Sequence, residues 1–220
     1  MSENYSISEE NYLKAIFHLQ TEDGSVSTNA LAEKLQTKPA SVTDMMKKLS
    51  SKNLLHYKPY YGFTLTSDGK RIALGIIRRH RLWEYFLYEK LHFGWEEVHQ
   101  IAEELEHVSS KKLIDKLDEF LGFPKFDPHG DPIPDNKGKV DTIEQININE
   151  LPLSKKAIVV NVSNQTKPLL DELAIMNIAI GTTLEVKKKS EYDGSLIVLI
   201  KNKRKLLTTQ ITKNLFVKLL

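Results

Sequence analysis

The chain contains no cysteine among its 220 residues. This absence excludes a disulfide framework, a thiolate metal site and a thiol nucleophile, and nothing points to an oxidising compartment. Long apolar runs are also missing, because no segment approaches the roughly 20 apolar residues that a membrane-spanning helix needs. The first residues, MSENYSISEENYLKAIFHL, carry acidic side chains where a signal peptide carries positive charge. The sequence therefore predicts a cytoplasmic protein with no membrane partner.

A strong net charge is the third feature that the sequence lacks. The formal net charge is +2, with 40% apolar and 27% charged residues. These values are typical of a globular protein, and the length leaves room for a sizeable core and more than one domain. Any affinity for DNA must come from a local basic patch, since the whole chain is close to neutral.

Histidine and glutamate recur at helical spacing in the middle of the chain. One cluster is His80-x3-Glu84. The second cluster follows about twenty residues later and comprises His99, Glu103, Glu106 and His107. Residues three or four apart share one face of a helix, so each cluster offers imidazole and carboxylate groups to one point. A lone His-x3-Glu is usually a surface ion pair, but these groups packed together would repel each other without a cation. The pattern predicts a divalent metal site.

Residues 26 to 65 have the pattern of a winged helix-turn-helix. A helix expected from Ser8 to about Gln20, with Ser8 as N-cap, precedes this unit. Ser27 is the expected cap of a short helix, and Pro39 suits the first turn of a second helix that runs to about Asn53. Two β-prone runs around Pro59-Tyr60-Tyr61 then predict a wing hairpin, and a long helix follows through Leu91.

The second of the two short helices is the candidate reader of a major groove. Its lysines are predicted to contact phosphates, whereas Ser41 and Thr43 are predicted to reach base edges. The predicted DNA-binding residues are Thr28, Lys38, Pro39, Ala40, Ser41, Thr43, Asp44, Lys47, Lys48 and Lys58. The alternative is that this unit mediates protein contacts and that its lysines form a solvated face.

The segment from 74 to 91, LGIIRRHRLWEYFLYEKL, carries more large apolar side chains than one buried helix face needs. Part of this surface is expected to pack against a partner subunit, which predicts a homodimer. Two-fold symmetry would place two recognition helices on successive major-groove turns of a pseudo-palindromic operator. Further helices are expected over about 95–108 and 110–121.

The composition changes towards the C-terminus. Residues 122–150 are rich in proline, glycine, aspartate and asparagine, so an ordered turn and a linker are expected. Residues 151–220 contain several short β-branched runs and one helical insert at 167–176, which together predict a small barrel.

Four segments resemble the metal-dependent repressors of the diphtheria toxin repressor family, especially the manganese transport regulator branch. They are residues 28–53, RRHRLWE, AEELEHVSS and LGFPKFDPHGDPIP. The resemblance covers nearly the whole chain. It implies a mainly α protein with a small β-barrel: a winged helix-turn-helix domain at 1–73, a helical dimerisation and metal-binding domain with linker at 74–150, and an SH3-like domain at 151–220. In such proteins metal binding stabilises the DNA-binding arrangement and represses metal-uptake genes.

The resemblance also implies a ligand set for each of two metal sites. The regulatory site would take Asn11, Glu103, Glu106 and His107. The ancillary site would take His80, Glu84, His99 and Asp127. Two departures from the family pattern stand out in the first helix. Asn11 replaces an aspartate or methionine, and Lys14 replaces a second carboxylate of the compact manganese regulators, which argues against a paired-metal site. His129 is interpreted as a surface residue. The resemblance also implies that the SH3-like domain can lend a ligand to the ancillary site; the matching position is near Asn164 or Gln165, and neither residue is acidic.

The donor set favours manganese. Oxygen and nitrogen ligands without sulfur suit the harder divalent ions, Mn²⁺ or Fe²⁺, although zinc accepts the same set. Glu103 in place of a cysteine points away from the iron branch of the family. The prediction is a manganese-dependent repressor. The alternatives are an iron-dependent repressor, a metal-independent winged-helix regulator, and a metalloenzyme that uses the clusters, although no His-Glu-x-x-His motif is present.

Overall fold

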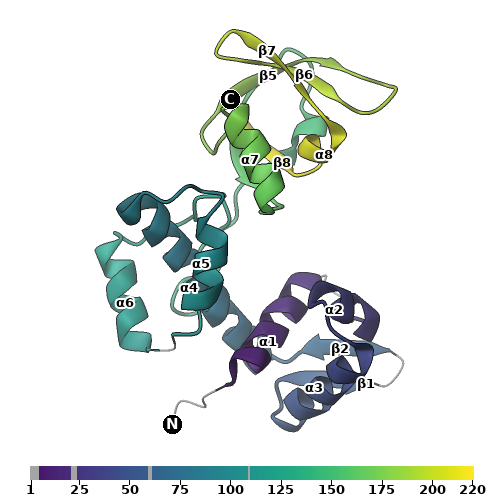
Figure 1. Cartoon of the computed structure of the whole chain (residues 1–220), viewed down its shortest axis with the longest axis vertical. Coiled ribbons are helices and arrows are strands. Elements are labelled where there is room, and N and C mark those ends of the chain that lie inside the picture. Colours follow the sequence, from purple (N-terminus) through teal and green to yellow (C-terminus); the bar gives the residue numbers. More distant parts are fainter. Residues whose placement is uncertain (1–4, 21–23, 59–60, 109) are drawn as a thin grey trace. The chain divides into compact units, whose positions relative to one another are not determined.

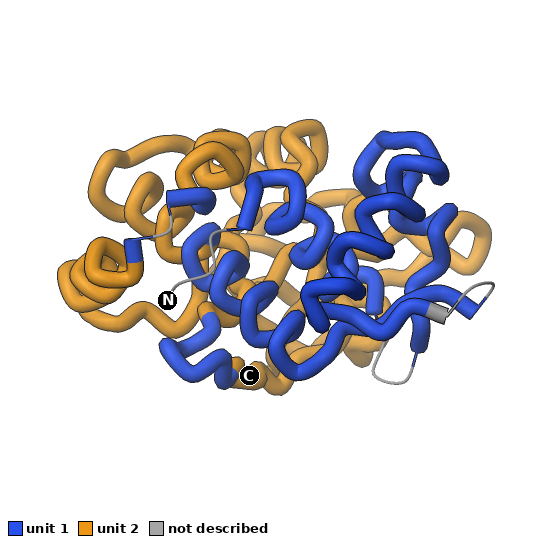
Figure 2. Tube along the Cα trace, turned by 90° about the horizontal axis from the view of Figure 1, so that it is seen from below, with its two compact units in different colours: residues 1–80, 106–110, 134–139 blue, residues 81–105, 111–133, 140–220 orange. Residues whose placement is uncertain are grey.

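The computed structural model describes residues 5–20, 24–58, 61–108 and 110–220. The chain divides into two compact units, coloured blue and orange in Figure 2. The first unit combines residues 1–80 with 106–110 and 134–139. The second unit combines residues 81–105 with 111–133 and 140–220. Both units are therefore assembled from segments that lie far apart in the sequence.

Three helices and a hairpin open the first unit (Figure 1). They are α1 (Ile7–Leu19), α2 (Thr28–Lys34), α3 (Pro39–Ser51), β1 (Leu55–Lys58) and β2 (Gly62–Leu65). The strands are antiparallel, with Leu55 opposite Leu65. The winged helix-turn-helix expected for residues 26–65 is confirmed, while Pro59 and Tyr60 of the expected turn lie outside the described residues.

Side-chain caps set the helix starts in this unit. Ser6, not Ser8, is the N-cap of α1, because its hydroxyl accepts from Glu9 N while the Glu9 carboxylate accepts from Ser6 N. This reciprocal pair needs a glutamate three residues after the serine, which Ser8 does not have. The predicted cap at Ser27 is confirmed, since its hydroxyl accepts from Ala30 N. Pro39 occupies the first turn of α3, as predicted.

One apolar core holds the DNA-binding elements together. It is formed by α1, α2, α3, the hairpin and the start of α4 (Ser67–Leu91). Helix α3 buries Val42, Met46 and Leu49, which recur at helical spacing on one face. The opposite face of α3 is therefore left exposed.

Helix α4 does not bury its apolar excess in the way the sequence suggested. Ile76 belongs to the core of the first unit, and Leu82 and Leu87 pack in two clusters of the second unit. Only Leu91, at the end of the helix, is strongly exposed among the large aliphatic residues of this segment. Most of the large apolar side chains of this segment are thus covered within the chain, while Tyr88 and Leu91 near its end are exposed.

The next two helices are shorter than predicted. Helix α5 covers Val98–Leu105 and α6 covers Lys111–Phe120. Glu106 and His107 therefore lie in a turn beyond α5, although a helix was expected to continue to 108. The backbone carbonyl of Glu106 accepts a hydrogen bond from Arg79 Nε, a side-chain partner of the kind that satisfies the last carbonyls of a helix.

The C-terminal part of the second unit is a single antiparallel sheet. Its elements are β3 (Ile146–Asn147), the short helix η1 (Ile148–Glu150), β4 (Lys156–Val162), α7 (Lys167–Ile175), β5 (Thr183–Lys189), β6 (Leu196–Ile200), β7 (Lys203–Leu207), α8 (Thr209–Thr212) and β8 (Leu215–Leu219). The strand order is β3-β8-β4-β5-β6-β7. The predicted strands and helix α7 are confirmed, whereas β3, α8 and β8 were not foreseen. No pairing between the described strands closes this sheet into a barrel.

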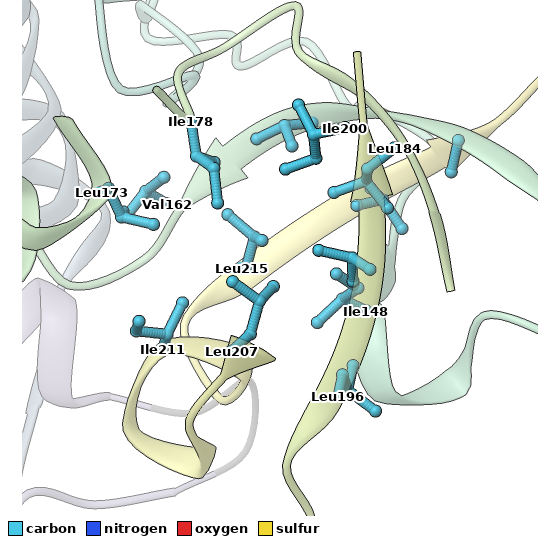
Figure 3. Packing of buried hydrophobic residues seen from close by; sticks show 14 of the residues in the cluster. Ile148, Val162, Leu173, Ile178, Leu184, Leu196, Ile200, Leu207, Ile211 and Leu215 are labelled. Atoms are coloured by element: carbon cyan, nitrogen blue, oxygen red, sulfur yellow. The ribbon is translucent and has the colours of Figure 1, made fainter. Parts of the chain in front are cut away.

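Alternating apolar side chains fill the interior of this domain (Figure 3). Strand β6 shows the pattern best, because Leu196, Val198 and Ile200 point into the core and the residues between them do not. Figure 3 shows Leu184, Leu207 and other core side chains from different strands converging on the same space. None of the described helices is both long and apolar enough to cross a membrane.

Candidate metal centre

Three buried side chains in the second unit converge on one point. Glu84 comes from α4, while Asp127 and His129 come from the loop after α6. One ligand atom of each residue lies within 4.8 Å of the others, and all three residues are buried. A carboxylate pair and an imidazole at this spacing can hold a divalent ion.

The loop from 126 to 132 fixes the orientation of two of these side chains. Asp127 Oδ1 accepts from the backbone N–H of His129 at 2.8 Å and of Asp131 at 2.9 Å. His129 Nε2 donates to the backbone oxygen of Trp95 at 2.7 Å, and the two rings stack. A hydrogen bond at one ring nitrogen sets the tautomer, so Nδ1 of His129 is left as a lone-pair donor.

Two atoms of this cluster lack hydrogen bonds among the described residues, and a bound metal ion would take the place of those bonds. Asp127 Oδ2 and His129 Nδ1 are buried, and neither has a hydrogen-bond partner among the described residues. Arg81 Nε is the nearest cation to Asp127 Oδ2, at 3.6 Å. Buried polar atoms without partners are costly, and two of them aimed at the same point fit a cation between them.

Burial also shifts the pKa values of Asp127 and His129. Burial, together with the Glu84 and Asp131 carboxylates, raises the pKa of Asp127 well above its usual value, against a smaller opposing effect of Arg81. Burial lowers the pKa of His129. Both groups are thus driven toward their neutral forms, which is the expected state of a ligand cluster before a cation compensates its charge.

His99 and Glu103 lie at the edge of this region. His99 Nδ1 is 3.0 Å from Glu84 Oε1, and its Nε2 is 3.7 Å from Glu103 Oε1. The side chains of His99 and Glu103 are both 40% exposed. His99 and Glu84, both predicted for the ancillary site, therefore lie next to each other, and their role as metal ligands stays a prediction.

A second cluster of predicted ligands lies in the first unit, around Glu106. His80 Nδ1 is 2.7 Å from Glu106 Oε2, and Lys14 Nζ donates to both carboxylate oxygens. The side chain of Glu106 has no solvent exposure. Burial would raise the pKa of Glu106, but the hydrogen bond from His80 and the Lys14 charge more than offset it, so this pKa is lowered.

His107 is held in place by an acidic residue that the sequence reading did not include. Glu10 Oε2 is 2.6 Å from His107 Nδ1, and Glu10 Oε1 accepts from Arg79 at 2.7 Å. A carboxylate on one ring nitrogen orients the imidazole and leaves the other nitrogen for a metal. The Nε2 atom of His107 lies 3.7 Å from Glu106 Oε1, on the side where such an ion would sit.

The side chain of Asn11 shows whether this second cluster suits a metal ion. Its side-chain oxygen is buried and has no hydrogen-bond partner among the described residues. An amide oxygen is a metal ligand without charge, and here it lacks any other partner. Asn11, Glu106 and His107 of the predicted regulatory site thus lie in this unit, together with His80 of the predicted ancillary site. Glu103 belongs to the other unit, and its assignment to the regulatory site stays a prediction.

Two sequence interpretations change. His129 is fully buried beside Glu84 and Asp127 and is not a surface residue. The sequence signal that could have indicated this burial is its position between Asp127 and Gly130 in an anchored loop. Gln165 donates to Asp131 Oδ2 at 3.0 Å, and the Asn164 side-chain oxygen accepts from Thr166 N at 2.9 Å. Both C-terminal amides therefore have other hydrogen-bond roles.

Comparison with known proteins assigns the three parts of the chain. Residues 5–63 match the family described as "Iron dependent repressor, N-terminal DNA binding domain", and residues 66–135 match "Iron dependent repressor, metal binding and dimerisation domain". Residues 146–219 match the FeoA domain. The HTH-type transcriptional regulator MntR of Oceanobacillus iheyensis is 37% identical over 118 residues, which are 54% of this chain and 80% of that protein. The chain belongs to the diphtheria toxin repressor family of metal-dependent repressors.

Other relatives of this repressor agree. The iron-dependent repressor IdeR of Mycobacterium leprae is 32% identical over 125 residues, covering 57% of this chain and 54% of that protein. A solved structure described as a manganese-dependent transcriptional repressor in complex with manganese is 32% identical, with a TM-score of 0.87, and the match covers 96% of this chain and all of that one. The protein is a DNA-binding repressor and not a metalloenzyme.

The recognition helix of the repressor presents most of the predicted DNA-binding residues to solvent. Those that are exposed are Lys38, Pro39, Ala40, Ser41, Asp44, Lys47 and Lys48. Thr43 is half-buried, and its hydroxyl donates to the Pro39 carbonyl at 3.0 Å. Thr28 is the first residue of α2 and is half-buried. Lys58 is the last residue of β1.

Two of the exposed lysines are paired with acidic residues. Lys47 Nζ is 3.7 Å from Asp44, and because both side chains are largely exposed, solvent screens this pair. Lys48 Nζ is 3.2 Å from the buried Glu9 carboxylate. Burial would raise the pKa of Glu9, but Lys52, the Ser6 backbone and Lys48 lower it to about 2. Lys48 therefore helps to hold α1 against α3, and among these lysines Lys38 and Lys47 are the better candidates for phosphate contacts.

Proposed function

We propose that this repressor responds to manganese in the cytoplasm, binds an operator as a homodimer and lowers the expression of metal-uptake genes. The observation that carries the proposal is the buried cluster of Glu84, Asp127 and His129, in which Asp127 Oδ2 and His129 Nδ1 have no hydrogen-bond partner among the described residues. The cluster lies in a chain that also carries an exposed recognition helix. Metal sensing coupled to DNA binding accounts for both features.

The donor chemistry supports manganese. The candidate ligands are carboxylate, imidazole and amide groups, and the chain has no cysteine to supply a thiolate. Such a set suits Mn²⁺ and Fe²⁺, and zinc also accepts it. We therefore keep Fe²⁺ and Zn²⁺ as the ions to compare with Mn²⁺.

Two ligand groups follow from the residues. One comprises Glu84, Asp127 and His129, with His99 and the sequence-predicted His80 as further candidates. The other comprises Asn11, Glu106 and His107, with Glu103 from the sequence prediction. An ion at the second group would join α1 to the turn after α5. A bound ion supplies positive charge there, and its binding energy would offset the entropy lost when these segments are ordered.

The dimer and the domain limits remain part of the proposal. Large exposed apolar side chains in the second unit support an interface there: Tyr88, Leu91, Phe93, Leu113, Phe120 and Phe123. Such side chains are typical of surfaces that pack against a partner. We propose domain limits at 1–73, 74–150 and 151–220, and we retain the small barrel as the expected form of the last domain.

The test is DNA binding measured by fluorescence anisotropy on a metal-transporter promoter. Mn²⁺, Zn²⁺ and anaerobic Fe²⁺ are titrated at fixed salt, because salt alone changes such affinities strongly. We expect Mn²⁺ to raise the affinity by at least about tenfold, which corresponds to a coupling free energy of about 1.4 kcal/mol. The double variant Glu106→Ala with His107→Ala is expected to lose this response.

The control is Glu172→Ala, which removes an exposed carboxylate of α7 that belongs to neither ligand group. It should respond to Mn²⁺ as the wild type does. Tight DNA binding in the absence of any metal, or no binding with any of the three ions, would contradict the proposal.

DNA contact is tested on the recognition helix. Lys38→Ala and Lys47→Ala should each weaken DNA binding to a similar degree for different sequences, since a lysine on a phosphate carries no base information. Each should also reduce the slope of log affinity against log salt by about 1. Lys155→Ala, at an exposed lysine before β4, serves as the control. An unchanged salt slope in both variants would place the DNA-binding face elsewhere.

A further inference from the structure

Lys14 is bound to the most buried carboxylate of the first unit. Its Nζ atom lies 2.7 Å from Glu106 Oε1 and 2.8 Å from Oε2. The lysine side chain is 13% exposed and that of Glu106 is completely buried. A bidentate pair with so little access to water is held far more strongly than a surface ion pair.

The two buried carboxylates of this cluster each have a cationic partner. The buried carboxylates of Glu106 and Glu10 face the ammonium of Lys14 and the guanidinium of Arg79. The two histidines of this cluster, His80 and His107, each contact one of these carboxylates. A divalent ion entering beside Lys14 would add two positive charges where each carboxylate already has a cation beside it, in surroundings where repulsion at a few ångströms is poorly screened.

The carboxylate of Glu106 already accepts three hydrogen bonds. Its Oε1 atom accepts from Lys14, and its Oε2 atom accepts from Lys14 and from His80. The neighbouring candidate ligand Asn11 brings an oxygen but no negative charge to compensate. An ion that binds Glu106 therefore competes with these partners, and among the described ones Lys14 carries a permanent positive charge.

We propose that the Lys14 ammonium is the built-in cation of this site, which a divalent metal must displace from Glu106 in order to bind. Lys14 then sets the metal concentration at which the site fills and limits it to a single ion. The inference rests on the proposed function, because it assumes that Glu106 and His107 bind the metal. The cluster of Glu84, Asp127 and His129 has a different cation beside it, Arg81 at 3.6 Å from Asp127 Oδ2, so the two sites should fill at different metal concentrations.

The first test is metal affinity. Mn²⁺ is titrated by calorimetry into the full-length wild type, Lys14→Met and Lys14→Arg. Methionine retains the apolar stem without the charge, and one class of sites should bind Mn²⁺ about ten- to a hundredfold more tightly. Arginine retains a cation that can form the same pair, so Lys14→Arg should stay near the wild type.

The alternative is that Lys14 is a permanent structural partner of Glu106. In that case Lys14→Met would misplace the carboxylate, and Mn²⁺ would bind with equal or lower affinity, which overturns the inference. If the wild type and Lys14→Met bind Mn²⁺ equally well, the inference about Lys14 is wrong but the proposed function still stands. If neither protein takes up Mn²⁺, the proposed function fails together with this inference.

A second measurement uses the wild type alone and does not depend on the variant folding. An amine-reactive label is applied with and without saturating Mn²⁺, and the modified lysines are identified by mass spectrometry. Lys14 should react slowly in the metal-free protein and at least about tenfold faster with Mn²⁺, as the local opening of its ion pair is no longer required. The exposed Lys155 should react equally in both states. Protection of Lys14 that persists with saturating Mn²⁺ would overturn the proposal.

Discussion

Asp127→Asn is expected to stabilise the metal-free protein and to weaken manganese binding at the same time. The amide keeps the oxygen that accepts from the backbone N–H groups of His129 and Asp131. It removes the charge that is buried beside Glu84. The metal-free protein should gain about 1–2 kcal/mol of stability at neutral pH, which corresponds to a rise of a few degrees in melting temperature.

The sign follows from the direction of the pKa shift. A carboxyl group whose pKa is raised on folding costs stability above its ordinary pKa, and that cost disappears as the pH falls. The pKa of Asp127 is raised by burial first and by Glu84 next, so the cost is present at neutral pH. Removing the charge removes the cost, but it also removes an anionic ligand, and manganese affinity at this site should fall by about a hundredfold.

Melting temperatures measured with and without Mn²⁺ check both effects. The matched control is Asp115→Asn, at an exposed aspartate of α6, which should change neither value. A metal-free variant that melts below the wild type and still shows the full manganese-dependent rise would mean that Asp127 is a structural residue and not a ligand.

The local elements could be predicted because their signals are local. The proline at the start of α3 and the serine cap of α2 each act within one turn of helix, and both were found. Strand β8 was missed although it lies in the middle of the sheet order, between β3 and β4. Its residues LFVKL are too short a pattern at the end of the chain to separate a strand from an apolar tail.

The candidate metal ligands were predictable in kind but not in grouping. The spacing of histidine and glutamate identified Glu84 and Glu106, because i, i+3 and i, i+4 neighbours share a helix face. His129 was rejected since a single loop histidine has no such spacing. What makes it a candidate is its hydrogen bond to Trp95, more than thirty residues away, and the docking of its loop on β4. Contacts of this range depend on tertiary packing, which periodicity does not encode.

Gly130→Ala should remove metal binding at the Glu84 cluster without touching a ligand. Gly130 lies in the left-handed region, with φ of +89°, directly after His129. A Cβ atom there would lie 1.9 Å from the backbone oxygen of Val160 in β4. Val162 N also donates to the His129 carbonyl at 3.0 Å, so the loop and the strand cannot separate without losing this bond.

The clash must therefore displace the loop that carries Asp127 and His129. Backbone strain alone at a left-handed residue costs about 1–2 kcal/mol. Gly122→Ala is the matched control, because Gly122 has φ of +77° but nothing within 4 Å of the added carbon. Gly122→Ala should show only the cost of strain, whereas Gly130→Ala should lose about 3–5 kcal/mol in total and most of its manganese-dependent stabilisation. Thermal unfolding with and without Mn²⁺ separates the two variants, and equal behaviour would show that the packing of the loop on β4 does not hold the ligands in place.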